Sequence, residues 1–324
     1  MPSKNVLIRC DSSSIIGVGH LMRTLLLAQG LRSNFEITFA TQELVGNQNK
    51  LIHQHGFAHI CLQSMACKEF LHVMSALKPT LCILDHYDIN KACESELRKI
   101  APLLVFDDTY REHDADIILN HSFIAGHKRY KSDPLTKILA GHRYTLLKPT
   151  FLMPHNTFTP LNTLKNKKVL ITLGGSDPLQ LSIHIKKALL NIEKSLRTTI
   201  VTTSANAHLK HLKILDKELI VNEKEMASLM KNHDLIITSA SSSLLEACAL
   251  KKPFIALECA SNQHETILFL QAKNLANALE KFSVSSLKKA LNFVQYQPNK
   301  LKRFLKEYNF KKSEVFKEIE NAYC

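Results

Sequence analysis

The chain has 324 residues, of which 45% are hydrophobic and 22% charged, with 9 Gly and 10 Pro. This composition is typical of a globular protein with substantial apolar cores, and it excludes disordered, collagen-like and low-complexity sequences. The length favours two domains. The formal net charge of +13 raises nucleic-acid binding as a function, but residues 281–324 alone supply +6 of it. Because these basic residues are not interleaved with stacking aromatics on a recognisable module, we expect no nucleic-acid partner.

The N-terminal residues and the cysteines indicate a compartment. The apolar run Val6–Ile8 is followed at once by Arg9 and Asp11, which is too short for a secretion signal, so we expect a cytoplasmic protein. No apolar run approaches the ~20 residues that span a bilayer, and we expect no membrane partner. The eight cysteines are scattered without CxxC pairs, and we expect them to be buried free thiols.

In the first half of the chain, short apolar runs alternate with amphipathic segments of helical length. The predicted strands are Val6–Arg9, Ile37–Ala40, Ala58–Leu62, Leu81–Leu84 and Leu103–Phe106. Such alternation is typical of parallel strands joined by helices. It predicts an α/β domain with a doubly wound sheet over residues 1–150.

The same alternation restarts after a polar, proline-bearing stretch at 148–160, which we interpret as a linker and hinge candidate. The strands predicted after it are Val169–Leu173, Thr199–Thr202, Leu219–Val221, Leu235–Ile237 and Phe254–Leu257. A helix is expected to begin near Pro178, with Asp177 as its N-cap. These elements predict a second α/β domain over 161–280, followed by a basic helical tail over 281–324.

Ligands of open α/β sheets bind beyond the carboxyl ends of the strands. The first strand runs into a polar loop with Gly17 and Gly19, where backbone can approach a ligand closely. Met22 replaces the third glycine of a dinucleotide fingerprint, which disfavours NAD. His20 lies where the next helix begins, and this position helps to keep the imidazole neutral and able to accept a proton. We interpret His20 as a general-base candidate, with a capping or packing role as the alternative.

Five further polar residues belong to the same edge of the predicted sheet. Arg23 can bind an anion or pair with a surface acid. Asp85 and Tyr87 follow the fourth strand, and Asp85 can orient His20 through a hydrogen bond or cap the next helix. The paired acids Asp107 and Asp108 can hold a metal or solvate a turn. No second acidic cluster and no zinc spacing accompanies them, so we expect no metal.

In the second half, two loops of small residues each end a strand and open a helix, where backbone N–H groups can stabilise phosphate. The first is not a Walker loop, because it lacks the Gly-Lys-Ser/Thr ending. Glu246 follows the second loop and can accept bonds from a ribose diol or remain a surface acid. The candidate binding residues here are Gly174, Gly175, Ser241, Ser242, Ser243, Glu246, Asn262 and Gln263.

Several of these segments match a known family. They are Arg9-Cys10-Asp11-Ser12-Ser13-Ser14, Gly17-x-Gly19-His20-x-x-Arg23, Asp85-His86-Tyr87, Phe106-Asp107-Asp108, Asp116-Ile117-Ile118-Leu119-Asn120, Gly174-Gly175-Ser176-Asp177, Ser241–Glu246 and Asn262-Gln263. With them, the chain resembles the UDP-2,4-diacetamido-2,4,6-trideoxy-β-L-altropyranose hydrolases of pseudaminic acid biosynthesis over about residues 5–275. Two departures are Cys10, where a small Ala or Ser is expected, and Ser176, where Thr is frequent.

The resemblance implies two Rossmann-like lobes of the glycosyltransferase-B type with a ligand cleft between them and UDP held mostly by the second lobe. It implies an inverting, metal-independent hydrolysis of the anomeric C–O bond that needs no cofactor and serves flagellin glycosylation. His20 falls on the proposed water-activating base. Tyr87 and Asn262 fall on positions near the substrate and diphosphate, and Glu246 falls on the ribose-binding acid.

Two other functions stay open. A glycosyltransferase of the same fold would use a UDP-sugar donor and require an acceptor. A non-catalytic UDP-sugar-binding scaffold would bind tightly without releasing UDP. Contacts with other enzymes of the pathway are also left open.

Overall fold

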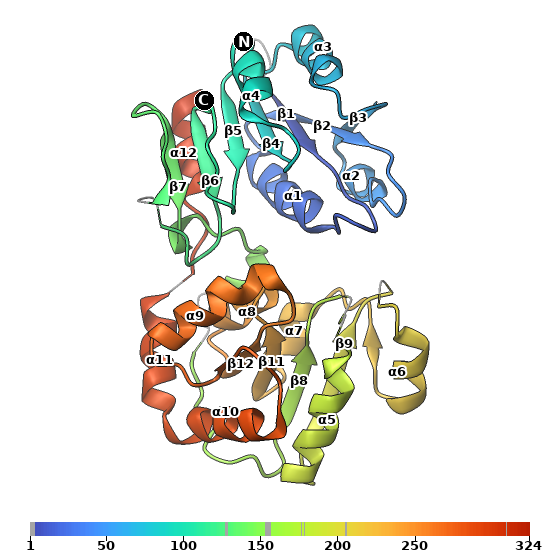
Figure 1. Cartoon of the computed structure of the whole chain (residues 1–324), viewed down its shortest axis with the longest axis vertical. Coiled ribbons are helices and arrows are strands. Elements are labelled where there is room, and N and C mark those ends of the chain that lie inside the picture. The colour runs from blue at the N-terminus through green and yellow to red at the C-terminus, as the bar shows by residue number, and fades with distance from the viewer. Residues whose placement is uncertain are drawn as a thin grey trace. The chain divides into compact units, whose positions relative to one another are not determined.

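The computed structural model describes residues 4–126, 129–152, 157–175, 177, 179–204, 206–308 and 310–324. The chain forms two compact units (Figure 1). Unit 1 comprises Met1–Leu146 together with Lys312–Cys324, and unit 2 comprises Leu147–Lys311. The chain therefore leaves unit 1 once and returns to it at its C-terminal end.

Unit 1 contains a seven-stranded parallel sheet in the order β3-β2-β1-β4-β5-β6-β7. Its strands are β1 (Asn5–Cys10), β2 (Glu36–Gln42), β3 (Ala58–Leu62), β4 (Leu81–Asp85), β5 (Leu103–Phe106), β6 (Ile117–Asn120) and β7 (Lys137–Ala140). Its helices are α1 (Gly19–Leu31), α2 (Lys50–Gln54), α3 (Cys67–Leu77), α4 (Lys91–Arg98), the 3-10 turn η2 (His142–Tyr144) and α12 (Val315–Tyr323). The five strands expected in this half are confirmed, and β6 and β7 were not predicted.

Two apolar cores cover the two faces of this sheet. Alternate residues of β1 divide between them, because Val6 and Ile8 belong to one core and Leu7 to the other. The first core also contains Val315 and Ile319 of α12, which packs against α1. Helix α12 is therefore an integral part of unit 1.

Unit 2 contains a six-stranded parallel sheet in the order β10-β9-β8-β11-β12-β13. Its strands are β8 (Lys168–Thr172), β9 (Arg197–Thr202), β10 (Ile220–Val221), β11 (Leu235–Ser239), β12 (Phe254–Leu257) and β13 (Ala278–Leu279). Its helices are the 3-10 turn η3 (Pro149–Phe151), α5 (Leu181–Ile192), α6 (Leu209–Leu215), α7 (Met226–Lys231), α8 (Ser242–Ala249), the 3-10 turn η4 (Ser261–Gln263), α9 (His264–Ala272), α10 (Val284–Tyr296) and α11 (Pro298–Glu307). The five strands predicted here are confirmed, and the two-residue β13 was missed.

Both sheets have the strand order of the Rossmann fold, in which the order reverses beside the first strand. The reversal lies between β1 and β4 in unit 1 and between β8 and β11 in unit 2. Loops at the carboxyl ends of these four strands are the expected ligand-binding positions. The predicted α/β fold with two Rossmann-like sheets is thus confirmed.

Three local predictions differ from the structure. Helix α5 begins at Leu181, because Gln180 is left-handed with φ 52°, although the Asp177 carboxylate still accepts from Leu181 N–H at 3.0 Å. Pro178 and residues 153–156 of the predicted linker lie outside the described residues. The segment 281–324, expected as a separate tail, is divided: α10 and α11 belong to unit 2 and α12 to unit 1 (Figure 1).

The cysteines only partly follow the prediction. Cys67 on α3 and Cys93 on α4 form a disulfide, so the expectation of free thiols is wrong for this pair. The remaining six are free, and four of these are buried: Cys10, Cys82, Cys248 and Cys259. In the described part of the chain, no helix has both the length and the apolar character needed to cross a membrane.

Candidate active site

The reversal of strand order in unit 1 brings two sequence-predicted segments together. Strands β1 and β4 pair in parallel with Cys10 opposite Asp85, so the loop after β1 and the segment after β4 share one edge of the sheet. In the first loop, Gly17 has φ +80° and exchanges backbone hydrogen bonds with Ser13. This left-handed turn, which glycine adopts without steric cost, directs the chain into α1 at Gly19.

His20, Arg23 and Asp85 form a buried cluster at this edge. Nδ1 of His20 lies 2.6 Å from Oδ1 of Asp85, and Nε of Arg23 donates to Oδ2 of Asp85 at 2.6 Å. Burial alone would raise the pKa of Asp85, but Arg23 and the hydrogen bonds lower it to about 2. Nδ1 of His20 also lies 3.1 Å from a guanidinium nitrogen of Arg23, but its shorter contact is with the ionised carboxylate, which favours the tautomer with the hydrogen on Nδ1. In that tautomer Nε2 is the nitrogen that can accept a proton.

Arg23 is held from several sides. Besides Asp85, its guanidinium contacts Asp108 at 3.2 Å and lies 5.2 Å from the ring centroid of Phe106. Burial would lower the pKa of Arg23, yet the neighbouring carboxylates raise it. Arg23 is therefore a fixed positive charge beside the imidazole.

Tyr87 lies against the catalytic candidate. Its ring meets the His20 ring edge-on, with centroids 4.8 Å apart, and its hydroxyl donates to Asp108 at 2.9 Å. Burial and the Asp108 carboxylate raise the pKa of Tyr87 to about 12. The phenol thus remains protonated near neutral pH, and with a 48% exposed side chain it can also meet a ligand.

A second buried cluster supports the segment after β4. The Asp11 carboxylate accepts from Arg9 at 2.7 and 2.8 Å and lies 3.1 Å from Nε2 of His86. Nδ1 of His86 accepts from the backbone N–H of Asp88 at 3.1 Å, so Nε2 is the donor to Asp11. Burial would raise the pKa of Asp11, but its bonds to His86 and Arg9 lower it to about 2.

Arg111 also fastens this segment. Its guanidinium donates to the carbonyl oxygens of His86 and Ile89 at 3.1 Å each, and to that of Tyr87. One side chain therefore forms hydrogen bonds to three backbone carbonyls of the segment between Asp85 and α4. Sequence reasoning missed Arg111, because a lone arginine three residues beyond paired acids carries no motif.

The paired acids after β5 have separate roles. Asp107 accepts from the N–H groups of Thr109 and Tyr110 and lies 3.5 Å from Nε2 of buried His113, which also contacts Glu94 at 2.8 Å. Asp108 instead contacts Arg23 and Tyr87. Within the described ranges no group of three or more His, Cys, Asp or Glu could hold a metal ion.

His121 is a neighbour of the site that sequence reasoning missed. Its Nε2 lies 3.4 Å from Arg23, and its Nδ1 is a buried atom for which the structure shows no hydrogen-bond partner. Burial and the positive charge of Arg23 lower the pKa of His121 to about 4. Its position directly after β6 would have indicated that it lies at the carboxyl edge of the sheet, but that strand was not predicted.

In unit 2, the two small-residue loops lie at the corresponding reversal of strand order. Gly174 after β8 has φ +87°, and a Cβ on Gly175 would lie only 2.8 Å from Oγ1 of Thr203, so both positions favour glycine. After β11, the hydroxyls of Ser239 and Ser241 lie 2.8 Å apart. No side-chain hydrogen bond caps α8 at Ser241, and Leu244 N–H donates to the Ser241 carbonyl at 3.0 Å, so the N–H groups of Ser242 and Ser243 are those open to an acceptor.

The remaining candidates of unit 2 follow β11 and β12. On α8, Ser242 is exposed, while Ser243 and Glu246 are half-buried. Burial raises the pKa of Glu246 to about 7, with an opposing effect of Lys148. Asn262 is exposed, and Oε1 of Gln263 accepts from Cys259 N–H at 2.9 Å, so Gln263 holds its own loop.

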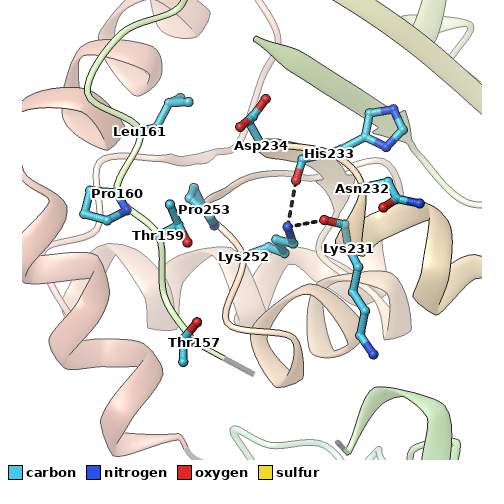
Figure 2. A pocket seen from close by; sticks show the side chains of 10 residues that line it. All are labelled: Thr157, Thr159, Pro160, Leu161, Lys231, Asn232, His233, Asp234, Lys252 and Pro253. Atoms are coloured by element: carbon cyan, nitrogen blue, oxygen red, sulfur yellow. Dashed lines mark hydrogen bonds between the residues drawn. The ribbon is translucent and has the colours of Figure 1, made fainter. Parts of the chain in front are cut away.

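A small polar cavity of about 130 Å³ lies elsewhere in unit 2 (Figure 2). Its lining includes His233, Asp234 and Pro253, which directly precede β11 and β12, so it belongs to the amino edge of the sheet. Figure 2 shows Lys252 bonded to the carbonyls of Lys231 and His233, at 2.6 and 2.9 Å. These bonds satisfy backbone acceptors and place this lysine away from the carboxyl-edge loops.

The fold has close structural counterparts among solved proteins. MurG of Acinetobacter baumannii superimposes with a TM-score of 0.64 over 98% of this chain and 99% of that chain, at 14% identity. The spinosyn rhamnosyltransferase SpnG gives 0.61 over 98% of this chain and 100% of that one, at 13% identity. These likenesses confirm the glycosyltransferase-B type of fold.

No family model matches the chain. A curated relative matches it. The UDP-2,4-diacetamido-2,4,6-trideoxy-β-L-altropyranose hydrolase of Campylobacter jejuni is 32% identical over 277 residues, which cover 83% of this chain and 96% of that protein. The chain belongs to the family of UDP-2,4-diacetamido-2,4,6-trideoxy-β-L-altropyranose hydrolases.

Proposed function

We propose that this protein hydrolyses UDP-2,4-diacetamido-2,4,6-trideoxy-β-L-altropyranose to UDP and 2,4-diacetamido-2,4,6-trideoxy-L-altropyranose in pseudaminic acid biosynthesis. Family membership supports the substrate class. The observation that carries the proposed mechanism is the 2.6 Å bond between Nδ1 of His20 and the ionised Asp85. It leaves Nε2 as the atom that can take a proton from water.

In the proposed step, Nε2 of His20 removes a proton from water while the water oxygen bonds to the anomeric carbon. The bond from that carbon to the diphosphate oxygen breaks, and its electron pair leaves with UDP. Attack on the face opposite UDP inverts the anomeric configuration. Asp85 acts as a positioning residue, since it fixes the tautomer of His20 and stabilises the imidazolium that forms. General-base catalysis of this kind contributes about 10²–10⁴ in rate.

The departing diphosphate gains negative charge, which preorganised donors can stabilise. The open N–H groups at the start of α8 and the glycine loop after β8 are suited to this role. With these donors the proposed step requires no metal and no cofactor. Glu246 has two acceptor oxygens for the ribose hydroxyls, and Tyr87 and Asn262 are proposed to meet the sugar and the diphosphate. We propose that the reaction takes place in the cytoplasm.

The test is hydrolysis of the purified UDP-sugar in ¹⁸O-labelled water, with NMR and mass spectrometry of the products. Label in the sugar and not in UDP is expected, because the anomeric C–O bond is the one that breaks. His20→Ala should remove most turnover while changing UDP affinity less than about twofold. His55→Ala is the control. His55 belongs to the same unit, lies just before β3 at the amino edge of the sheet, and bonds to Gln29. Equal losses of rate and UDP affinity in His20→Ala would contradict the base assignment.

A glycosyltransferase is the second candidate, because the fold is shared with the transferase SpnG. Such an enzyme would release UDP only when an acceptor is present. Turnover with water alone therefore separates the two functions. Tight UDP-sugar binding without any UDP release would instead favour a non-catalytic scaffold.

A further inference from the structure

Most of the exposed apolar side chains of unit 1 lie at one edge of its sheet. Among the described residues, seven large hydrophobic residues of this unit are exposed, by 36% to 94%, and six of them follow β1, β2, β3 or β4 at the carboxyl edge. We call these six the apolar rim: Ile15, Ile16, Val18, Val45, Met65 and Tyr87. Isolated exposed apolar residues are ordinary, but a group confined to one edge indicates a binding surface.

The loops that carry the rim are fastened to one another. Ser14 N–H donates to the carbonyl of Val45 at 2.9 Å, which joins the loop after β1 to the loop after β2. Oγ of Ser13 accepts from the N–H groups of Ile15 and Ile16 at 3.1 and 2.9 Å. Although Ile15 is 94% exposed and Val45 85%, their backbones are held in place. The exposure therefore belongs to an ordered surface.

This surface adjoins the ionised cluster. The loop of Ile15, Ile16 and Val18 ends where α1 begins, one residue before His20. Tyr87, the rim residue after β4, stacks edge-on against the His20 ring. A ligand whose reacting atom is near Nε2 of His20 would therefore lie close to Tyr87, and the loop of Ile15, Ile16 and Val18 leads directly into the helix that carries His20.

The sugar of the proposed substrate has matching chemistry. Its two acetamido groups and its deoxygenated C6 supply three methyl groups, while C3 carries the single free hydroxyl of the ring. Burial of methyl groups against apolar side chains is favourable, whereas burial of hydroxyls without partners is costly. An apolar rim therefore favours this sugar over a hexose with several hydroxyls.

We propose that the apolar rim binds the methyl-bearing face of the sugar and selects N-acetylated 6-deoxy sugars from other UDP-sugars. This inference rests on the proposed function, whose site it extends. The rim recognises the sugar alone, so its contribution is absent from the affinity for UDP.

The test uses Ile15→Ser, Val45→Ser and the double variant, which remove apolar groups from exposed positions without opening the core. Leu135→Ser is the matched control, since Leu135 is 86% exposed in the same unit but precedes β7 at the opposite edge of the sheet. Rates of UDP release give kcat and KM, and calorimetry gives the Kd of UDP. We expect each single variant to raise KM about three- to tenfold, with kcat and the Kd of UDP within twofold of wild type.

Unchanged KM in the double variant, or equal loss of affinity for UDP and UDP-sugar, would overturn the proposal. So would an equal effect of Leu135→Ser. If the wild-type protein releases no UDP, the proposed function fails by itself. The calorimetric Kd of the intact UDP-sugar then replaces KM, and a loss confined to that ligand still supports the rim.

Discussion

Asp85→Asn tests the link between the buried carboxylate and His20. An asparagine has one acceptor oxygen, whereas Asp85 serves both Nδ1 of His20 and two nitrogens of Arg23. Arg23 can only donate, so the amide oxygen turns to Arg23 and the NH₂ group faces His20. Nδ1 then has to accept, and the hydrogen moves to Nε2, where the proton of water should be received.

The expected loss in kcat is about 10²–10⁴, the usual contribution of a general base. This corresponds to about 3–5 kcal/mol of transition-state stabilisation. The stability loss should be moderate, about 2–3 kcal/mol, because Arg23 keeps its contact with Asp108. Single-turnover release of UDP measures the first quantity, and urea denaturation measures the second.

Asp11→Asn is the matched control. Asp11 is also a buried carboxylate shared by an arginine and a histidine, yet it does not contact His20. In Asp11→Asn the amide oxygen can still accept from Arg9, but the fully buried Arg9 loses the charge and the second acceptor of its carboxylate partner. We therefore expect this variant to destabilise the protein at least as much as Asp85→Asn. The rate loss should be smaller, at most about tenfold. If the two variants lose rate in proportion to stability, the tautomer argument is refuted.

Three further predictions concern Glu246, Arg111 and the disulfide. The raised pKa of Glu246, about 7, means that folding stability falls as pH rises from about 4.5 to 7. Glu246→Gln should therefore stabilise the protein by about 1–2 kcal/mol at pH 8 and leave its stability unchanged at pH 4. Thermal unfolding at the two pH values measures this, and equal effects at both would contradict it. Arg111→Met should lower kcat about 10- to 100-fold, because it frees the segment that carries Tyr87. Arg111→Lys should restore part of this rate. Unchanged steady-state rates in Arg111→Met would exclude a positioning role for Arg111. Reduction of Cys67–Cys93, which closes a separation of 26 residues, should cost about 3 kcal/mol in denaturant unfolding, and the double serine variant should not respond to reductant.

The strands that the sequence predicted are those with dense apolar runs. Of the thirteen strands in the described residues, ten were predicted, because parallel strands buried on both faces have nearly continuous hydrophobic sequences. β7 begins with exposed Lys137, and β13 has only two residues, so neither produces a clear pattern. The buried strand β6 was not predicted either, and without it His121 had no structural context.

The sequence singles out His20 and Asp85 as candidates, but it does not predict the geometry that joins them. His20 and Asp85 lie 65 residues apart, and only the pairing of β1 with β4 brings them to 2.6 Å. Arg111 and Asp108 act through loop conformations set by tertiary contacts, which periodicity does not encode. The disulfide was missed for the same reason, since Cys67 and Cys93 meet only where α3 packs against α4.

The return of the chain to unit 1 has a consequence for biosynthesis. A ribosome adds residues 312–324 after all of unit 2, yet Val315 and Ile319 complete the core beneath α1. At Gly30 of α1, a Cβ would lie 2.0 Å from the Phe316 ring, so the two helices meet without a gap. The helix that carries His20 and Arg23 therefore gains this packing partner only after the whole of unit 2 has been synthesised. A nascent chain that stops short of α12 would contain every catalytic candidate and still lack the helix that packs against α1.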